Sequence, residues 1–488
     1  MADEGTAVPN LARGWTAPGG PASPGDFRLG PGALNAETTQ RVARLDKVLP
    51  KSGVQSLLLG ANRNITPWCS RDPFSIAPDP DIKYCLQSDD SVSPEWIPQG
   101  VTGVSDAKDN ELWGDAGNIQ LFASYDGSDP GRNDDPEKPG GDCTASELED
   151  DDACNQKGVR ITFVQSRINP ATGSPEVKYR HVLLGWTYIN SADHVSFDGL
   201  HASENPLQTG VHAGGIVWYG NYLYLADTRN GLRVFDMRYI MDLDPDGDPT
   251  THDAMGADTD GVNTTANIED KTKVGRQNNV WYSFGYRYVM PQVAAWKFQA
   301  LQSNPKGDYA CVSSGAPKAS WISLDRSTTP DRLLLGEYCK PREEDGLTST
   351  GRIASYPIAA LEGRSADVPA EGWANYLPLT DGGAQGAAAK DGTLYVNQSK
   401  GIDEPGNLWR YRWSNGNLVA SGQAVKTARG AEDLYIERGT GRLWSISEHR
   451  PGPTDCKLAH AGDDNPGETD YCQRVLYGHK LSWLDSQP

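Results

Sequence analysis

The chain has 488 residues, with 45 Lys and Arg against 65 Asp and Glu, which gives a formal net charge of −20. This charge excludes a typical nucleic-acid binder and disfavours anionic membrane surfaces, because both partners require a basic patch. Hydrophobic residues make up 37%, and the 53 Gly and 33 Pro predict many turns and an all-β protein. No apolar run approaches the roughly 18 residues that span a bilayer, so we expect no membrane insertion.

Residues 1–50 are expected to form an N-terminal tail that is rich in Pro, Gly and Ala in its first half. The segment 33–49, ALNAETTQRVARLDKVL, predicts one short helix. The first residues contain neither a basic nor an apolar stretch of the kind found in signal peptides, so we expect a signal peptide to be absent from this chain. Residues 51–488 are then expected to form a single domain.

A repeated pattern dominates the rest of the chain, and its best copies are the segments 214–237, 386–413 and 430–449. Each copy runs from small residues into an apolar strand with a Leu-Tyr pair, then a turn and a second strand with an aromatic residue. The pairs that begin at Leu394 and Leu434 stand 40 residues apart, which is within the period of a four-stranded propeller blade.

Weaker copies of the pattern fill the intervals, for example at 98–127 and 286–299. Counting them gives about six units, with seven and five as alternatives. A single blade cannot bury both faces of its sheet, so a closed ring of blades is the stable arrangement. The sequence therefore predicts a β-propeller, six-bladed in the first instance, in which the acidic segments 126–158 and 241–275 are long loops.

Three histidines lie close together in the sequence, at His194, His201 and His212. Their spacing matches no zinc signature, and the chain has no GxSxG, P-loop or dinucleotide motif. A general acid–base pair of His194 with Asp198 is one interpretation of this cluster. The alternative is that these side chains bond to the backbone of a loop.

The segment 242–253, DLDPDGDPTTHD, predicts a structural calcium site. Calcium takes six to eight oxygen ligands, and its best-known loop has carboxylates at positions 1, 3, 5 and 12 around a glycine at position 6. The glycine here is Gly247, and the alternative is a solvated acidic loop. The candidate metal ligands are Asp242, Asp244, Asp246, Asp248 and Asp253.

The starts of the innermost propeller strands predict a ligand site, because these strand ends converge at the mouth of the central channel. Polar residues precede small residues or a Leu-Tyr strand at several of these positions, and such a set suits a metal or a polyhydroxy ligand. The alternative is that the polar groups bond to neighbouring blades and close the ring. The candidate ligand-binding residues are Gln99, His212, Gln385, Glu432 and Asp433, with Glu432 facing the channel.

Eight cysteines fall into four local couples, and no CxxC motif is present. Short bridges across polar loops are typical of proteins from oxidising compartments, so we expect a secreted protein with disulfide-stapled loops. Nearest-neighbour pairing is one of 105 possible connectivities. It predicts the disulfides Cys69–Cys85, Cys143–Cys154, Cys311–Cys339 and Cys456–Cys472.

The runs HAGGIVWYGNYLYLADTRNGLRVFDM and GYRYVMPQV resemble uncharacterised secreted actinobacterial β-propeller proteins over roughly residues 95–485. More distantly, LYLADT and LYVNQS are similar to segments of six-bladed lactonase-like and strictosidine-synthase-like propellers. The resemblance implies a propeller fold and, for the distant families, a divalent metal in a polar central channel. Propellers include both binding proteins and enzymes, so it implies no particular activity.

Two functions follow as expectations. The first is an extracellular ligand-binding or scaffold propeller, stabilised by calcium and binding a small molecule or a glycan. It rests on the 14 Trp and 20 Tyr, the acidic loops and the lack of a catalytic motif. The alternative is a calcium-dependent hydrolase or lyase that acts at the channel mouth. The sequence leaves the oligomeric state open.

Overall fold

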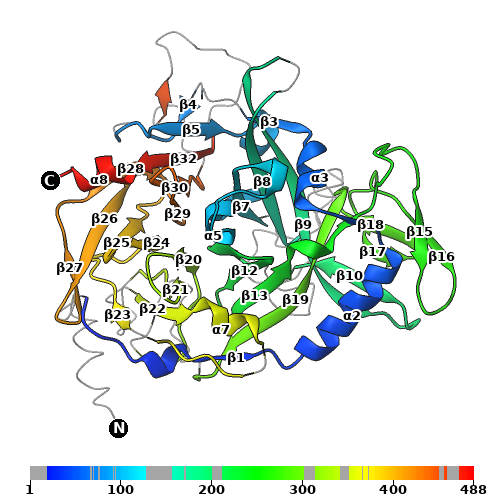
Figure 1. Ribbon diagram of the computed structural model, residues 1–488, viewed down its shortest axis with the longest axis horizontal. Helices are drawn as coiled ribbons and strands as arrows, with labels where there is room; N and C mark the ends of the chain where they lie inside the picture. Colours follow the sequence, from blue (N-terminus) through cyan, green and yellow to red (C-terminus); the bar gives the residue numbers. More distant parts are fainter. Residues whose placement is uncertain are drawn as a thin grey trace, which may run out of the picture.

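The computed structural model describes residues 19–65, 69, 71–74, 77–91, 93, 95–127, 157–169, 172–200, 211–301, 311, 314–340, 351–364, 366–371, 373–449, 456–458 and 472–488. Most strands in this part of the chain belong to four-stranded antiparallel units that follow one another around a ring (Figure 1). This arrangement is a β-propeller, as the repeated pattern predicts.

Each unit runs from an innermost to an outermost strand. The first unit is β6 (Trp96–Gly103), β7 (Ile119–Asp126), β8 (Val159–Ile168) and β9 (Pro175–Ile189). The second is β11 (Ile216–Tyr219), β12 (Tyr222–Asp227), β13 (Gly231–Asp236) and β19 (Tyr288–Phe298). The third is β20 (Trp321–Asp325), β21 (Arg332–Gly336), β22 (Arg352–Pro357) and β23 (Ala374–Tyr376). The fourth is β24 (Ala384–Lys390), β25 (Thr393–Gln398), β26 (Pro405–Ser414) and β27 (Asn417–Ala420). The fifth is β29 (Tyr435–Glu437), β30 (Arg442–Ile446), β32 (Val475–Lys480) and β5 (Ile82–Cys85).

The innermost strands close the ring. Strand β6 contacts β11 and β29, β11 contacts β20, β20 contacts β24, and β24 contacts β29. The described residues contain these five units, and the number of blades, given from the sequence as six with seven and five as alternatives, stays a prediction.

The fifth unit combines a strand from the N-terminal part of the chain with strands from its C-terminal part. Its outermost strand β5 pairs with β32, with Val475 opposite Cys85 and Gly478 opposite Ile82. Figure 1 shows this pairing as a blue strand beside a red one. Residues from the beginning and end of the propeller thus share one sheet. Hydrogen bonds between distant parts of the sequence therefore close the ring.

The Leu-Tyr pairs do not occupy equivalent positions in the units. Leu223 and Leu394 lie in β12 and β25, the second strands of their units, whereas Tyr435 begins the innermost strand β29. The spacing of 40 residues between the last two pairs is therefore not a blade period.

The hydrophobic core lies mainly between neighbouring units. Phe163 of the first unit packs with Trp218 of the second in one cluster, and Tyr435 of the fifth unit packs with Phe122 of the first in another. Because each sheet is covered on both faces, its strands are apolar runs such as RLLLG in β21 rather than strict alternations.

The N-terminal segment packs on the propeller from residue 19 onward and is not a free tail over that stretch. Helix α2 (Asn35–Val48) lies in the region where one short helix was expected. It contacts β19, β9 and β10 (Val195–Gly199), while β1 (Leu29–Pro31) pairs with β19. The proposed domain boundaries at residues 50 and 51 stay a prediction.

Part of the acidic segment 241–275, which was expected to be a loop, forms strands instead. A small four-stranded sheet has the order β15 (Ala254–Ala257), β16 (Asn263–Ala266), β18 (Val280–Ser283) and β17 (Val274–Gln277). It projects beside α2 on the right of Figure 1. The acidic residues thus occupy the turns of a sheet whose apolar residues, such as Trp281 and Met255, are buried.

The remaining short elements connect these sheets. They are η1 (Pro24–Phe27), β2 (Lys51–Ser52), α3 (Val54–Leu59), β3 (Arg63–Ile65), β4 (Arg71–Asp72), α4 (Ser88–Ser91), α5 (Val104–Ala107), η2 (Gly114–Ala116), η3 (Met237–Tyr239), β14 (Ile240–Asp242), α7 (Ile358–Glu362), β28 (Val425–Arg429), β31 (Lys457–Leu458) and α8 (Leu481–Asp485). Among the described helices, none has the length and apolar composition needed to cross a membrane.

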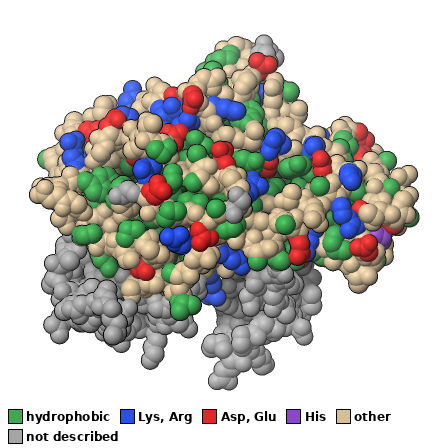
Figure 2. Space-filling model, turned by 60° about the horizontal axis from the view of Figure 1, so that its bottom comes forward, with side chains coloured by type: hydrophobic (Ala, Val, Ile, Leu, Met, Phe, Trp, Pro, Cys, Tyr) green, Lys and Arg blue, Asp and Glu red, His purple; other side chains and the backbone are tan. Residues whose placement is uncertain are grey.

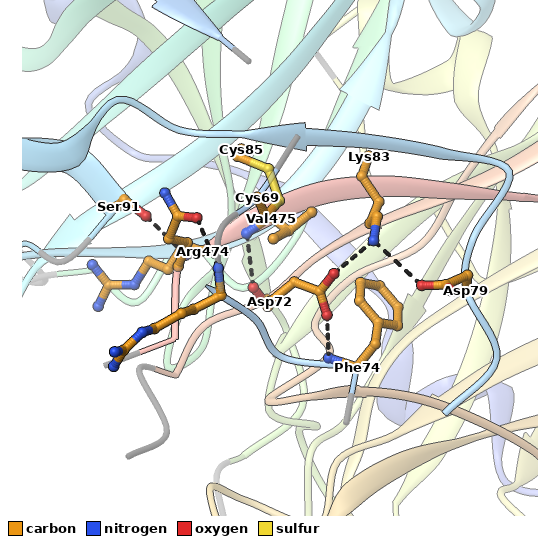
Figure 3. Close-up of a disulfide and its surroundings, with 12 residues drawn as sticks. Cys69, Asp72, Phe74, Asp79, Lys83, Cys85, Ser91, Arg474 and Val475 are labelled. Carbon is orange, nitrogen blue, oxygen red and sulfur yellow. Dashed lines mark hydrogen bonds and ion pairs between the residues drawn. A yellow bond between two sulfur atoms is a disulfide. The ribbon is translucent and has the colours of Figure 1, made fainter. Parts of the chain in front are cut away.

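Three of the four predicted disulfides are confirmed: Cys69–Cys85, Cys311–Cys339 and Cys456–Cys472. Cys143 and Cys154 lie outside the described residues. The Cys69–Cys85 bridge ties strand β5 to the segment before β4 (Figure 3).

An ion-pair cluster beside this bridge holds the same segment. Lys83 Nζ lies 2.6 Å from Asp72 Oδ2 and 3.3 Å from Asp79 Oδ1 (Figure 3). The backbone N–H of Phe74 donates to Asp72 Oδ1 at 3.2 Å. Strand β5, which closes the propeller, is therefore held by a disulfide bond, by the ion pairs of Lys83 and by its backbone hydrogen bonds to β32.

On the face of the molecule seen in Figure 2, acidic and basic side chains are interspersed, and no large area carries charge of one sign only. The net charge of −20 belongs to the whole sequence. On this face the charged side chains form no extended basic patch.

Candidate functional site

The entries of the innermost strands meet closely because they carry glycine. A Cβ on Gly215 would lie 2.1 Å from the backbone N of Ile322, and one on Gly386 would lie 2.5 Å from the Cα of Asp433. Only glycine permits backbones of neighbouring units to approach this far. The pattern of polar residues followed by small ones thus marks the end of the ring where the units touch.

A chain of polar side chains runs across this end from three units. Gln385 Nε2 donates to Glu432 Oε1 at 2.9 Å, and Gln99 Nε2 donates to Glu448 Oε1 at 2.9 Å. The carboxyl groups of Glu432 and Glu448 lie within hydrogen-bonding reach of each other. The structure therefore brings Gln99, Gln385 and Glu432 together, and it does so through Glu448.

Glu448 was not among the residues singled out from the sequence, although a local signal exists. Strands β29 and β30 form a hairpin in which Tyr435 faces Trp444. Past the ends of these strands Ala431 pairs with Ser447, and Glu448 N donates to Gly430 O at 2.7 Å, so residue 448 lies opposite residue 430. Following the hairpin past the strand ends therefore brings residue 448 into the neighbourhood of Glu432.

Burial raises the pKa of Glu432 well above its usual range, and the nearby carboxyl groups of Glu448 and Asp433 raise it further. Glu432 is fully buried, and its Oε2 has no hydrogen-bond partner among the described residues. Burial and neighbouring carboxyl groups thus both disfavour the charged form of Glu432.

Asp433 points away from Glu432, as neighbouring residues of an extended chain do. Its Oδ2 accepts from the N–H of Val101 at 3.2 Å, and the backbone of Ile216 lies near enough to lower its pKa. These residues belong to the entries of the first, second and fifth units. Burial raises the pKa of Asp433 well above its usual range, and the role of this residue in the structure is ring closure.

A further buried acid, Asp106, lies in α5 directly after β6. Thr102 Oγ1 donates to Asp106 Oδ2 at 2.9 Å, and burial raises the pKa of Asp106 to about 8. Asp106 in turn contributes to the raised pKa of Asp433. Several carboxyl groups near the centre of the ring are therefore held in their neutral form.

The exposed part of the site is formed by histidine and carboxyl groups. His449 Nε2 lies 3.4 Å from Glu448 Oε2, and the two side chains are 31% and 16% exposed. His212 is exposed, and its ring centroid lies 4.6 Å from that of Tyr125. The carbonyl of the next residue, Ala213, accepts from Gly100 N at 3.2 Å, so His212 lies at the entry of the first unit.

The other histidine interpretation is wrong. His194 Nε2 lies 2.9 Å from Asp260 Oδ2 in the small sheet, so its carboxylate partner is not Asp198. Asp198 Oδ1 accepts from the backbone N–H of Gly199 at 2.7 Å. His201 lies outside the described residues. The His194–Asp260 pair joins two loops, as the structural alternative for these histidines implies.

The acidic segment 242–253 divides into two groups. Asp244, Asp246 and Asp253 each offer a carboxylate oxygen, and these oxygens lie within 4.8 Å of one another. Asp242 instead accepts two hydrogen bonds from Arg287, at 2.7 and 2.9 Å.

The fifth candidate ligand of this loop also lies apart from the cluster. Asp248 accepts from the N–H and the hydroxyl of Thr250 at 3.1 and 2.7 Å. Three of the five predicted ligands thus share one cluster.

No protein-family model matches the chain, and no curated protein matches it. Among solved structures, the chain is similar to the β-xylosidase RS223, with 8% identity, 79% of this chain and 92% of that chain covered, and a TM-score of 0.32. It is similar to a GH43_1 enzyme from Xanthomonas citri complexed with xylotriose, with 9% identity, coverages of 80% and 90%, and a TM-score of 0.31. A third likeness is to the Dos1 propeller, with 11% identity, coverages of 55% and 63%, and a TM-score of 0.23. Likenesses this distant carry no conclusion about activity, and the resemblance to actinobacterial and lactonase-like propellers stays a prediction.

Proposed function

We propose that the protein is a ligand-binding propeller that holds a polyhydroxy ligand, in the first instance a glycan, at the channel mouth. The observation that carries the proposal is the hydrogen-bonded chain of Gln385, Glu432, Glu448 and Gln99, which joins three units at one end of the ring. Amide and carboxyl groups both donate and accept hydrogen bonds, as hydroxyl-rich ligands require.

The surroundings of this chain favour binding because they hold it rigidly. Arg474 Nε donates to Glu448 O at 2.7 Å, and Glu432 N donates to Ile446 O at 2.9 Å. A site whose polar groups are fixed before the ligand arrives loses little conformational entropy on binding. The partly exposed ring of His449, whose Nε2 lies 3.4 Å from Glu448 Oε2, then supplies a flat surface beside the polar groups.

Hydrolysis at the same mouth is the alternative, and the raised pKa of Glu432 is the observation in its favour, because a protonated carboxyl group is a general acid. One fact makes hydrolysis less favourable. Glycosidases hold their two carboxyl groups roughly 5 to 9.5 Å apart, on either side of the scissile bond, whereas Glu432 and Glu448 lie within reach of a direct hydrogen bond.

Export into an oxidising compartment is a further part of the proposal. It is supported by three disulfides among the described residues. Bridges of this kind persist where thiols are not kept reduced. Export would bring the channel mouth into contact with extracellular glycans.

The test is calorimetric titration of the full chain with a panel of neutral oligosaccharides that includes xylotriose. Glu448→Gln and Gln385→Ala should weaken binding at least about tenfold, because each removes a hydrogen bond or a charge at the site. Glu269→Gln, at an exposed position on the small sheet, is the control and should bind as the wild type does. Binding that is unchanged in both site variants would contradict the proposed site.

The same preparations decide between binding and hydrolysis. Incubation with the bound oligosaccharide, followed by chromatography, should recover it intact. Release of shorter sugars that is lost in Glu448→Gln would favour the hydrolase instead.

A further inference from the structure

The loop between β14 and β15 carries more negative charge than its surroundings balance. Four carboxylates, Asp242, Asp244, Asp246 and Asp253, face one guanidinium, that of Arg287. Arg287 binds Asp242 with two nitrogens and lies 3.4 Å from Asp244 Oδ2. Arg180 also acts on Asp242 and Asp244 through its charge, without an ion-pair contact to either. Asp246 and Asp253 have no ion pair with a basic side chain among those of the described residues.

Hydrogen bonds hold the loop in a shape that keeps the acids together. Thr251 Oγ1 lies 3.1 Å from Asp246 Oδ2 and 3.1 Å from Asp253 Oδ1. The N–H of Asp246 donates to Asp253 Oδ2 at 3.2 Å. Gly247 adopts a φ of +79°, the left-handed conformation that lets the chain turn at this point. The turn of the chain and these hydrogen bonds thus hold the carboxylates of Asp246 and Asp253 close to each other.

An unpartnered oxygen points to a missing ligand. Asp244 is 5% exposed, and its Oδ1 is buried with no hydrogen-bond partner among the described residues. Its other oxygen, Oδ2, faces Arg287, which leaves Oδ1 for the cluster with Asp246 and Asp253. A buried carboxylate oxygen without a donor costs free energy unless a cation or another polar group meets it.

We propose that Asp244, Asp246 and Asp253 bind one calcium ion that fixes the small sheet to the propeller. Calcium binds oxygen ligands at about 2.3 to 2.6 Å, so two ligands on opposite sides of one ion lie about 5 Å apart. The three carboxylate oxygens lie within 4.8 Å of one another, a separation that one such ion spans. The charge of the ion would offset two of the uncompensated negative charges.

The position of the loop gives the ion a structural role. Asp242 ends β14, whose Met241 pairs with Val289 of the propeller strand β19. Asp253 immediately precedes β15, and its carbonyl accepts from Ala266 N in β16 at 2.9 Å. An ion held by Asp244 and Asp253 therefore connects the propeller to the small sheet at the point where the chain passes between them.

The site differs from the one that the sequence pattern suggests. Asp242 is a positioning residue here, because it accepts from the N–H of Asp244 at 3.1 Å and holds Arg287. Asp248 is exposed and bonds to Thr250. This division supplies a matched pair of variants that carry the same change of charge in one loop.

The test uses the full chain after treatment with a chelator, titrated with calcium chloride in a calorimeter. We expect one site with a Kd of about 10⁻⁵ to 10⁻³ M and a higher Tm in calcium than in chelator, because the ion binds only the native loop. Asp244→Asn and Asp253→Asn should abolish the heat of binding and the Tm difference. Asp248→Asn should keep both, with a Kd within about threefold of the wild type.

Several results would overturn the site. They are equal Tm values of the wild type in calcium and in chelator, wild-type binding by Asp244→Asn and Asp253→Asn, and loss of binding by Asp248→Asn. If the buried positions do not tolerate substitution, Asp246→Asn at an exposed position serves instead, and unchanged binding by that variant would equally refute the proposal. No glycan is present in these measurements, so failure here is separate from failure of the proposed function.

Discussion

Replacing Asp106 by Asn tests whether the acids near the centre of the ring are held neutral. Asp106 is 4% exposed, and burial raises its pKa to about 8 against the opposing effect of Arg326 and Arg438. The ordinary pKa of an aspartic acid is about 3.9. The folded protein therefore retains a proton that the unfolded chain releases above about pH 4.

The sign and size of the effect follow from this difference. Below about pH 4 both states hold the proton, and Asp106 costs no stability. As the pH rises from about 4 to about 8, the unfolded chain ionises first, so the free energy of unfolding falls. A pKa difference of about 4 between the folded and unfolded states lowers the free energy of unfolding by at most about 6 kcal/mol over this pH range. Asn cannot ionise, and its amide oxygen still accepts from Thr102 Oγ1, which donates to Asp106 at 2.9 Å.

The assay is urea unfolding of the wild type and Asp106→Asn in steps of about one pH unit between about pH 4 and about pH 8. The wild type should lose several kcal/mol more than the variant over this range, and the variant should be the more stable of the two at neutral pH. Asp115→Asn, at an exposed position on η2, is the control and should follow the wild type. Parallel curves for wild type and Asp106→Asn would show that Asp106 ionises normally, and the reasoning would be wrong.

Other predictions concern the closure of the ring. Replacing Cys69 and Cys85 together by Ala should lower the free energy of unfolding by about 3 kcal/mol, because the bridge closes a loop with a sequence separation of 16. Urea unfolding checks this, and an unchanged midpoint would contradict it. Glu337→Gln should cost about 3 to 5 kcal/mol in the same assay, because it removes the nearer of two carboxylates, 2.9 Å away, and leaves the fully buried Arg352 with only Asp26, 3.1 Å away. A loss below about 1 kcal/mol would show that the pair is dispensable. Gly386→Ala should lower the Tm by several degrees, because the added Cβ would meet backbone 2.5 Å away. An unaltered melting curve would mean that the units are packed less tightly at this point.

The disulfides could be predicted from the sequence because the information is local. Each confirmed pair joins cysteines with a sequence separation of 16 or 28, and nearest neighbours in a turn-rich chain meet at low entropic cost. The repeated small, apolar and aromatic pattern likewise predicted antiparallel strands, and hence the propeller. The turn between β12 and β13 ends at Asn230-Gly231, a dipeptide that is a strong local signal for a hairpin turn.

The candidate site could be predicted only in part. Gln99, Gln385 and Glu432 were chosen because each precedes small residues or an apolar strand at a unit entry, and the structure joins them through hydrogen bonds. Glu448 was missed because it follows a strand end and carries no motif. In the acidic loop, the motif could not show that Arg287 takes Asp242 out of the cluster, because Arg287 comes from a different part of the chain.

What the sequence determined by itself is the class of fold, the local disulfides and the set of polar residues at the unit entries, all of which depend on neighbours along the chain. The tertiary structure alone decided the pairing of β5 with β32 and the division of the acids into those with raised pKa values, those paired with arginine and those that form a cluster. Strand β5 is only four residues long, and its partner lies almost 400 residues later. No periodicity marks such a pairing, because its stability comes from closing the ring and burying the faces of the first and last units together.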